Sequence, residues 1–450
     1  MKNDPLLILN GTLVSASSTM QEDIAVSNGR IEVIGILDPD QFQGYKIIDA
    51  GGKFVFPGGI DPHVHFSLPT PAGRSSDDFR SGSIAALAGG TTSFIDFVTP
   101  HRGQSLLAAL YQRRSEAASS LTGYHLHMGI SEWNPEIAAE IIPCIVKEGI
   151  RSFKTYLAYQ ESIGISYSDL QEVMEIVGPA GGLVMVHCED GEMIRRLQQE
   201  FIREGKTQAI YHALSHPSEA EVLAVNKVIG LSAKTKCPVY IVHTSTHQAA
   251  EAIRNAKEEG LPVFGETCPQ YLLLNDSVYD VNSDNLSALP YVISPPLRKT
   301  NDQEYLWKGL SDSTFDTVAT DHCPFNLFGQ KDLGNHDFTK IPNGAGGIEH
   351  RLTLLYTYGV LSGKININQF VSLVSTRPAE IFGMDDHKGK LYPGYDADIV
   401  IWDPEYQGII SSETHFQHCD SDIYEGFSIH GRPEIVIFGG KMVFREGKLI

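Results

Sequence analysis

Short apolar runs rich in β-branched and aromatic residues alternate with longer amphipathic stretches through the middle of the chain. Such runs are typical of buried strands, and the stretches between them have the length and periodicity of helices. The predicted strands are residues 92–97, 124–130, 152–156, 183–186, 239–242, 263–266 and 316–319, preceded by one that ends near His63. Predicted helices between them include residues 136–147, 218–234 and 246–259. Eight strands alternating with helices favour an α/β fold, a closed (β/α)8 TIM-type barrel over residues 57–390.

The two ends of the chain have a different pattern, in which short strands are joined by turn dipeptides. Asn10-Gly11 and Asn28-Gly29 each lie between two apolar runs, and both dipeptides favour two-residue hairpin turns. Residues 398–402 form another run, and Gly439-Gly440 separates two more near the C-terminus. Strands at both ends predict a small β-sandwich domain built from residues 1–56 and 391–450.

Composition narrows the class of protein. Hydrophobic residues make up 42% of the chain and charged residues 20%, the balance of a globular protein with ample core. A formal net charge of -20 argues against nucleic acid or an anionic membrane as the main partner. The chain has neither a membrane-length apolar run nor a signal-peptide pattern, and its six cysteines are scattered, so we expect reduced thiols in a cytoplasmic protein.

Candidate chemistry begins with the sequence Asp61-Pro62-His63-Val64-His65. Residues i and i+2 of a strand point to the same face, so both histidines can reach one ion. A pair of this kind is a weak signal by itself, because single histidines often pack in a core.

Four more polar residues each follow an apolar run: Lys154, His187, His243 and Asp321. Each alone has an ordinary structural explanation, such as a satisfied histidine or a helix-capping aspartate. Buried polar groups are costly without partners, however, and the carboxyl ends of barrel strands are where catalytic residues gather. The four residues and the histidine pair therefore predict one site.

The predicted ligands suit a pair of metal ions. Four imidazoles and a carboxylate are good ligands for zinc or a similar divalent ion, and they are too many for a single catalytic zinc. Two ions about 3.5–4 Å apart would use them all and would need a bridging group. Lys154 is the candidate, because a neutral lysine amine can add carbon dioxide and become an anionic carbamate.

The motifs resemble those of the hydantoinase or dihydropyrimidinase family of the amidohydrolase superfamily. They are GGIDPHVH (58–65), DDF (77–79), GGTT (89–92), SFK (152–154), AY (158–159), ETCPQYL (266–272), SPPLR (294–298), TDHCP (320–324) and IPNG (341–344). The resemblance extends from the first strands to the last, over essentially the whole chain.

The resemblance implies a binuclear centre, most simply of zinc, and relatives of this kind are commonly homotetramers and sometimes dimers. Its ligands would be His63, His65 and Asp321 for one ion, His187 and His243 for the other, and a carbamylated Lys154 (N6-carboxylysine) as the bridge.

The resemblance also implies a substrate site. Tyr159 would donate a hydrogen bond to the carbonyl oxygen under attack, and Ser294 and Asn343 would hold a cyclic imide through main-chain groups. The metals would lower the pKa of a water to about 7, and the resulting hydroxide would attack the ring carbonyl. Asp321 would carry the proton to the departing ring nitrogen, giving an N-carbamoyl amino acid.

Three alternatives are weighed against this function. Dihydroorotases carry an arginine where this chain has Ser67, which disfavours that substrate. Allantoinase stays open because Gly73-Arg74 lies in the next loop, although Ala158-Tyr159 resembles the hydantoinase pattern. Non-catalytic dihydropyrimidinase-related scaffold proteins have lost metal ligands, whereas all six positions are filled here. The loop at residues 66–71 departs from the family pattern and leaves substrate and enantiomer preference undecided.

Overall fold

The computed structural model describes residues 4–280 and 285–450, and its centre is a parallel barrel. The barrel strands are β8 (Gly59–Val64), β11 (Thr91–Val98), β12 (Gly123–Gly129), β13 (Ser152–Tyr156), β14 (Leu183–His187), β15 (Val239–Ile241), β16 (Val263–Thr267) and β17 (Thr317–Val318). Each strand pairs with the next one in the chain. A parallel bridge between Val64 and His322 brings the last strand back to the first. The predicted barrel is confirmed.

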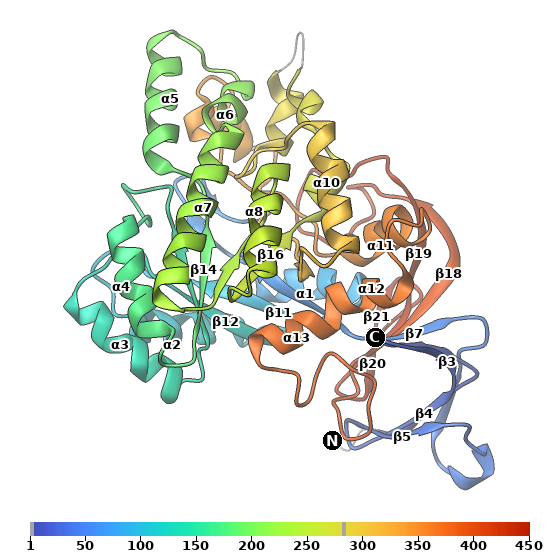
Figure 1. Cartoon of the computed structure of the whole chain (residues 1–450). Helices are drawn as coiled ribbons and strands as arrows, with labels where there is room; N and C mark the ends of the chain where they lie inside the picture. The colour runs from blue at the N-terminus through green and yellow to red at the C-terminus, as the bar shows by residue number, and fades with distance from the viewer. Residues whose placement is uncertain (1–3, 281–284) are drawn as a thin grey trace.

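Helices form the outer layer of the barrel (Figure 1). They are α1 (Phe79–Ala88), α2 (Leu106–Ala117), α3 (Pro135–Val146), α4 (Tyr167–Val177), α7 (Ser218–Thr235), α8 (His247–Glu258), α10 (Thr300–Ser311), α11 (Arg351–Leu355), α12 (Ile367–Val371) and α13 (Arg377–Phe382). Three more, α5 (Gly191–Arg203), α6 (Ile210–Ser215) and α9 (Pro269–Leu273), belong to loops that follow strands β14 and β16. Side-chain caps fix several of these helices; the Asp78 carboxylate, for example, accepts from the first amides of α1.

Two further sheets lie beside the barrel, at the side where both chain ends are found (Figure 1). One contains β1 (Leu6–Leu9), β4 (Asp23–Ser27), β5 (Arg30–Gly35) and β6 (Lys46–Asp49). The other contains β2 (Thr12–Val14), β3 (Thr19–Gln21), β7 (Phe54–Pro57), β18 (Ile399–Ile409), β19 (Ser428–Phe438), β20 (Lys441–Arg445) and β21 (Lys448–Leu449). One apolar core joins the sheets and takes residues from both ends, among them Ile8, Ile24, Ile399 and Ile437. The division at residues 56/57 and 390/391 stays a prediction.

One of the predicted hairpins is wrong. The strands on either side of Asn10-Gly11 do not pair with each other, because β1 pairs with β4 and β6 while β2 pairs with β3 and β7. Asn10 has a φ of 62°, and its side chain donates to Asp49 while its amide donates to Asp23. The dipeptide therefore turns the chain from one sheet into the other. The predicted hairpins at Asn28-Gly29 and Gly439-Gly440 are confirmed.

A search of the described helices for one long and apolar enough to cross a membrane found none.

Candidate active site and metal centre

The six predicted metal ligands all lie at the carboxyl-end mouth of the barrel, where their side chains are largely buried. His63 belongs to β8 and His65 follows it; His187 ends β14, and His243 and Asp321 follow β15 and β17. The bounds of β13 agree with the predicted strand 152–156, so Lys154 lies in the middle of its strand and not at its end, unlike His187. The run Ser152-Phe153 is only the first part of that strand.

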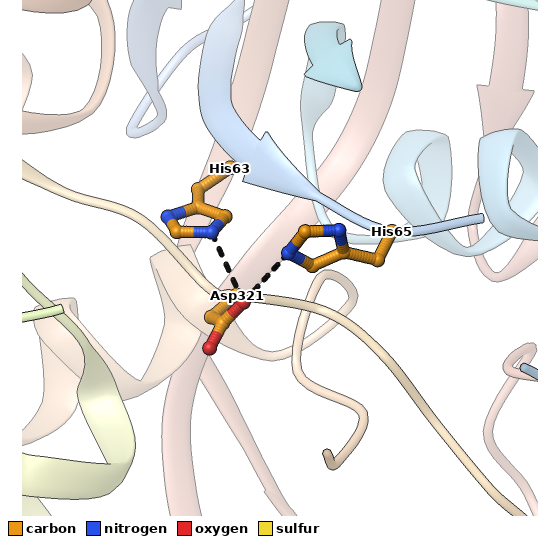
Figure 2. A group of neighbouring side chains, drawn as sticks. All are labelled: His63, His65 and Asp321. Carbon is orange, nitrogen blue, oxygen red and sulfur yellow. Dashed lines mark ion pairs between the residues drawn. The ribbon is translucent and has the colours of Figure 1, made fainter. Parts of the chain in front are cut away.

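The first half of the site is made by two histidines and one carboxylate. Figure 2 shows the imidazoles of His63 and His65 turned toward Asp321, with each Nε2 3.1 Å from Asp321 Oδ1. Burial raises the pKa of Asp321, but the two neighbouring imidazoles outweigh it and hold that pKa well below its usual range. Two nitrogens and one oxygen that converge in this way are a donor set for a divalent ion.

The second half is a pair of histidines from neighbouring strands. Nδ1 of His187 lies 2.9 Å from Nε2 of His243, so the two nitrogens point at one location. Burial lowers the pKa of His243 well below its usual value, which keeps the ring neutral. The ring centroids of His63 and His243 are 5.5 Å apart, so the two halves of the site adjoin.

Lys154 lies between the two halves. Its Nζ is 5.3 Å from the centre of the Phe97 ring, which stacks on His65, and 5.0 Å from the Tyr156 ring, which packs against His187. The side chain is fully buried, and among the described residues Nζ has no hydrogen-bond partner. Burial lowers the pKa of Lys154 to about 8, although the Asp321 and Glu266 carboxylates oppose the shift. An amine of this kind is readily deprotonated, as carbamate formation requires.

Two carboxylates that had no assigned role in the sequence orient these ligands. Glu266 Oε1 lies 2.7 Å from His63 Nδ1 and accepts from the amide of His243 at 2.8 Å. Glu189 Oε2 lies 2.9 Å from His187 Nε2. A metal-binding histidine normally donates its other ring N–H to such a group, which fixes the tautomer and the ring. Glu266 lies in a quoted motif and Glu189 lies two residues after His187, so weak signals were present for both.

The three predicted substrate residues also come together. The Tyr159 hydroxyl lies near the side chains of Ser294 and Asn343, which act to lower its pKa, and Asn343 Nδ2 donates to Ser294 Oγ at 3.0 Å. The Tyr159 ring packs 5.4 Å from that of His187. Burial raises the pKa of Tyr159, so its phenol keeps the proton it would need to donate.

Three of the site residues have a strained backbone. Tyr159, His243 and Asp321 have φ values of 57°, 36° and 53°, in the left-handed region that residues with a side chain rarely occupy. Such conformations cost about 1–3 kcal/mol each and persist where the surrounding structure enforces them, most often at functional sites.

A second His-x-His pair, His125 and His127, lies on β12, and we interpret it as part of the barrel packing. His127 is fully buried, with Nε2 2.9 Å from the Pro62 carbonyl and Nδ1 2.5 Å from Ser152 Oγ. Both ring nitrogens are thus occupied by the barrel itself, in agreement with that interpretation.

Comparisons with known proteins agree with this geometry. The sequence pattern of the Amidohydrolase family matches residues 54–443. A D-hydantoinase of Geobacillus stearothermophilus is 41% identical over 446 residues, covering 99% of this chain and 94% of the relative. A dihydropyrimidinase of Rattus norvegicus is 36% identical over 447 residues, covering 98% and 86%. The crystal structure of a dihydropyrimidinase from Brevibacillus agri has a TM-score of 0.97 and 39% identity, covering 99% and 96%.

The barrel, its mouth of histidines and carboxylates and the near full-length matches lead to one assignment. The chain belongs to the amidohydrolase family, and within it to the hydantoinase and dihydropyrimidinase group of cyclic-amide hydrolases.

Proposed function

We propose that this protein opens hydantoin or dihydropyrimidine rings by hydrolysis, giving N-carbamoyl amino acids, at a binuclear metal centre bridged by a carbamylated Lys154. The observation that carries the proposal is the buried, unpaired Nζ of Lys154 between His63, His65 and Asp321 on one side and His187 and His243 on the other. A bare ammonium would be repelled by cations there, whereas a carbamate offers one oxygen to each half.

The donor set fits a pair of divalent ions, for which zinc is our expectation. When bound, the ions would supply a water of lowered pKa and polarise the substrate carbonyl. Glu266 and Glu189 lie beside the outward ring nitrogens of His63 and His187 and would accept their N–H when the ions are bound, which leaves the opposite nitrogens to face the ions.

The chain's own residues would then handle protons and charge. Asp321 lies beside His63 and His65 and, as a carboxylate, would take the proton of the attacking water and deliver it to the ring nitrogen that departs. The Tyr159 hydroxyl donates to the oxygen on which negative charge develops. Ser294 and Asn343 lie beside that hydroxyl and would hold the imide ring through their main-chain groups.

An open pocket of about 820 Å³ lies beside Tyr159, and we propose that it receives the ring substituent. Its lining combines Ala158, Ile194 and Ile202 with the longer polar side chains of Arg195 and Gln198. Arg74, which left allantoinase open, is exposed and bonds to the carbonyl of Ser67 at 2.9 Å, so its guanidinium is held in its own loop. Arg74 therefore lends no support to allantoin as the substrate.

The proposed function is tested by ring-opening assays on dihydrouracil, a 5-aryl hydantoin and allantoin, with metal analysis of the same preparation. We expect turnover of the first two classes by protein holding two ions at the barrel mouth. Turnover of allantoin alone would make the protein an allantoinase. Absence of both turnover and metal would favour a non-catalytic scaffold.

Tyr159→Phe is expected to lower kcat by about 100-fold to 1,000-fold, the usual effect of removing one donor to a developing oxyanion, with a small change in KM. The ring is kept, so packing against His187 survives. Steady-state kinetics on the preferred substrate measure the changes in kcat and KM separately. Tyr211→Phe, at a tyrosine outside the site, is the control. Unchanged kcat would remove Tyr159 from the oxyanion role.

Location and assembly are proposals as well. We propose a cytoplasmic protein, supported by six free and scattered cysteines, five of them buried. A homotetramer, with a dimer as the alternative, follows from the family resemblance, and sedimentation equilibrium distinguishes the two.

A further inference from the structure

A second cluster of histidines and a carboxylate shares no residue with the site at the barrel mouth. His350 directly precedes α11, and His415, Gln417 and Asp422 belong to the segment between β18 and β19. The side chains of His350, His415 and Asp422 are 8%, 3% and 2% exposed, and Gln417 is 5% exposed. Four polar side chains are thus buried against one another without being part of the proposed active site.

Their polar atoms converge on one point. Asp422 Oδ2 lies 2.8 Å from His350 Nε2, 3.1 Å from His415 Nδ1 and 3.3 Å from Gln417 Nε2. Gln417 Nε2 lies 3.1 Å from His350 Nε2 and 3.3 Å from His415 Nδ1. The donors of a tetrahedral zinc site with bonds of about 2.1 Å are about 3.4 Å apart. The four atoms are therefore nearly at the spacing such an ion imposes.

Hydrogen bonds between neutral groups do not satisfy this cluster. His415 Nε2 donates to the Cys419 carbonyl at 2.9 Å, so Nδ1 of a neutral ring turns its lone pair toward the Asp422 carboxylate. His350 Nε2 must donate to the same carboxylate, yet the Gln417 amino group, also a donor, faces that nitrogen. The contact between His415 Nδ1 and Asp422 therefore joins two acceptors, and the contact between Gln417 Nε2 and His350 Nε2 joins two donors.

The Gln417 amide supplies a second observation. Its Oε1 is buried and has no partner among the residues the structure describes. The two ends of an amide have nearly the same shape, so a half turn brings the oxygen into the cluster and takes the amino group out. The turned amide changes the converging set to two imidazole nitrogens and two oxygens.

We propose that His350, His415, Gln417 and Asp422 bind one divalent transition-metal ion, distinct from those at the barrel mouth. Imidazoles with a carboxylate suit zinc and its neighbours, and a cation replaces both mismatched contacts with metal–ligand bonds. The His415 N–H held by a main-chain carbonyl is the usual outer support of such a ligand. The ion fastens the segment between β18 and β19 to the barrel, beside the hydrogen bond from the Phe416 amide to Glu349.

The first test counts ions in gel-filtered protein by mass spectrometry of the metals. His350→Asn is expected to hold one ion per chain fewer than wild type while keeping kcat near the wild-type value. His387→Asn, which removes a surface histidine paired with Asp386, is the matched control and keeps the full count. Equal counts in wild type and His350→Asn would overturn the proposal, whatever the barrel mouth binds.

Gln417→Glu provides a test that does not depend on how well His350→Asn folds. A glutamate carboxylate is a stronger metal ligand than an amide, so in zinc the melting temperature of the variant should be higher than that of wild type. In chelator it should be lower, because two carboxylates, at positions 417 and 422, then lie side by side without a metal ion between them. Subtracting wild type under each condition cancels the effect of ions at the barrel mouth. The same difference in zinc and in chelator would show a cluster held by two protonated histidines instead, and would overturn the proposal.

Discussion

Asp321→Asn should fold as the wild type does and lose at least about 1,000-fold in kcat, because the amide can no longer accept a proton while keeping nearly the same shape. In the wild type, one Asp321 oxygen lies 3.1 Å from both His63 and His65. Asparagine keeps an oxygen that can stay in that position, so much of the bound metal should remain.

Three measurements check the result: kcat on the preferred substrate, metal content and the circular dichroism spectrum. Asp38→Asn, at an exposed residue that caps a short helix in the N-terminal segment, controls for loss of charge alone. An Asp321→Asn enzyme with wild-type turnover would exclude the aspartate from proton transfer. Loss of turnover together with all metal would assign it a ligand role only.

Lys154→Ala should lose metal and more than about 100-fold in kcat, because the site then lacks the anion that offsets two cations. The substitution also leaves a space the length of the lysine side chain, which a small carboxylate such as propionate can enter. Added propionate with zinc is therefore expected to restore part of the activity.

Lys154→Met is the matched control, since methionine fills that space and leaves no room for a carboxylate. It should be as inactive as the alanine variant and should not respond to propionate. Wild-type enzyme prepared with ¹³C-labelled bicarbonate should show one carbamate carbon by NMR that both variants lack. An active Lys154→Met enzyme, or wild type without that signal, would refute the bridging carbamate.

Much of the barrel could be predicted because its strands are covered on both faces. Such strands are continuous apolar runs, and the length of each run marks it as a strand regardless of what it pairs with. The hairpin at Asn28-Gly29 could also be predicted from the local sequence, since β4 and β5 on either side of it pair with each other. The course of the chain at Asn10-Gly11 could not be predicted in this way. The contacts that direct it come from Asp23 and Asp49, which are distant in the sequence.

The residues of the site also divide into those that the local sequence reveals and those that it does not. His187 and Asp321 were recognisable because a polar residue after an apolar run is unusual wherever it lies. The role of Glu266 depends on which way its carboxylate points relative to His63, on a strand far away in the sequence, and sequence alone does not give that direction. The cluster of His350, His415 and Asp422 lies outside the barrel strands, so no strand pattern drew attention to it.

The pairing of β7 has a consequence for synthesis of the protein. β7 lies between β2, made just before it, and β18, which leaves the ribosome only after the entire barrel has been translated. Until then the nascent chain carries an open strand edge, of the sort that invites pairing with other chains. A chain whose synthesis stops before β18 therefore keeps one edge of β7 unpaired.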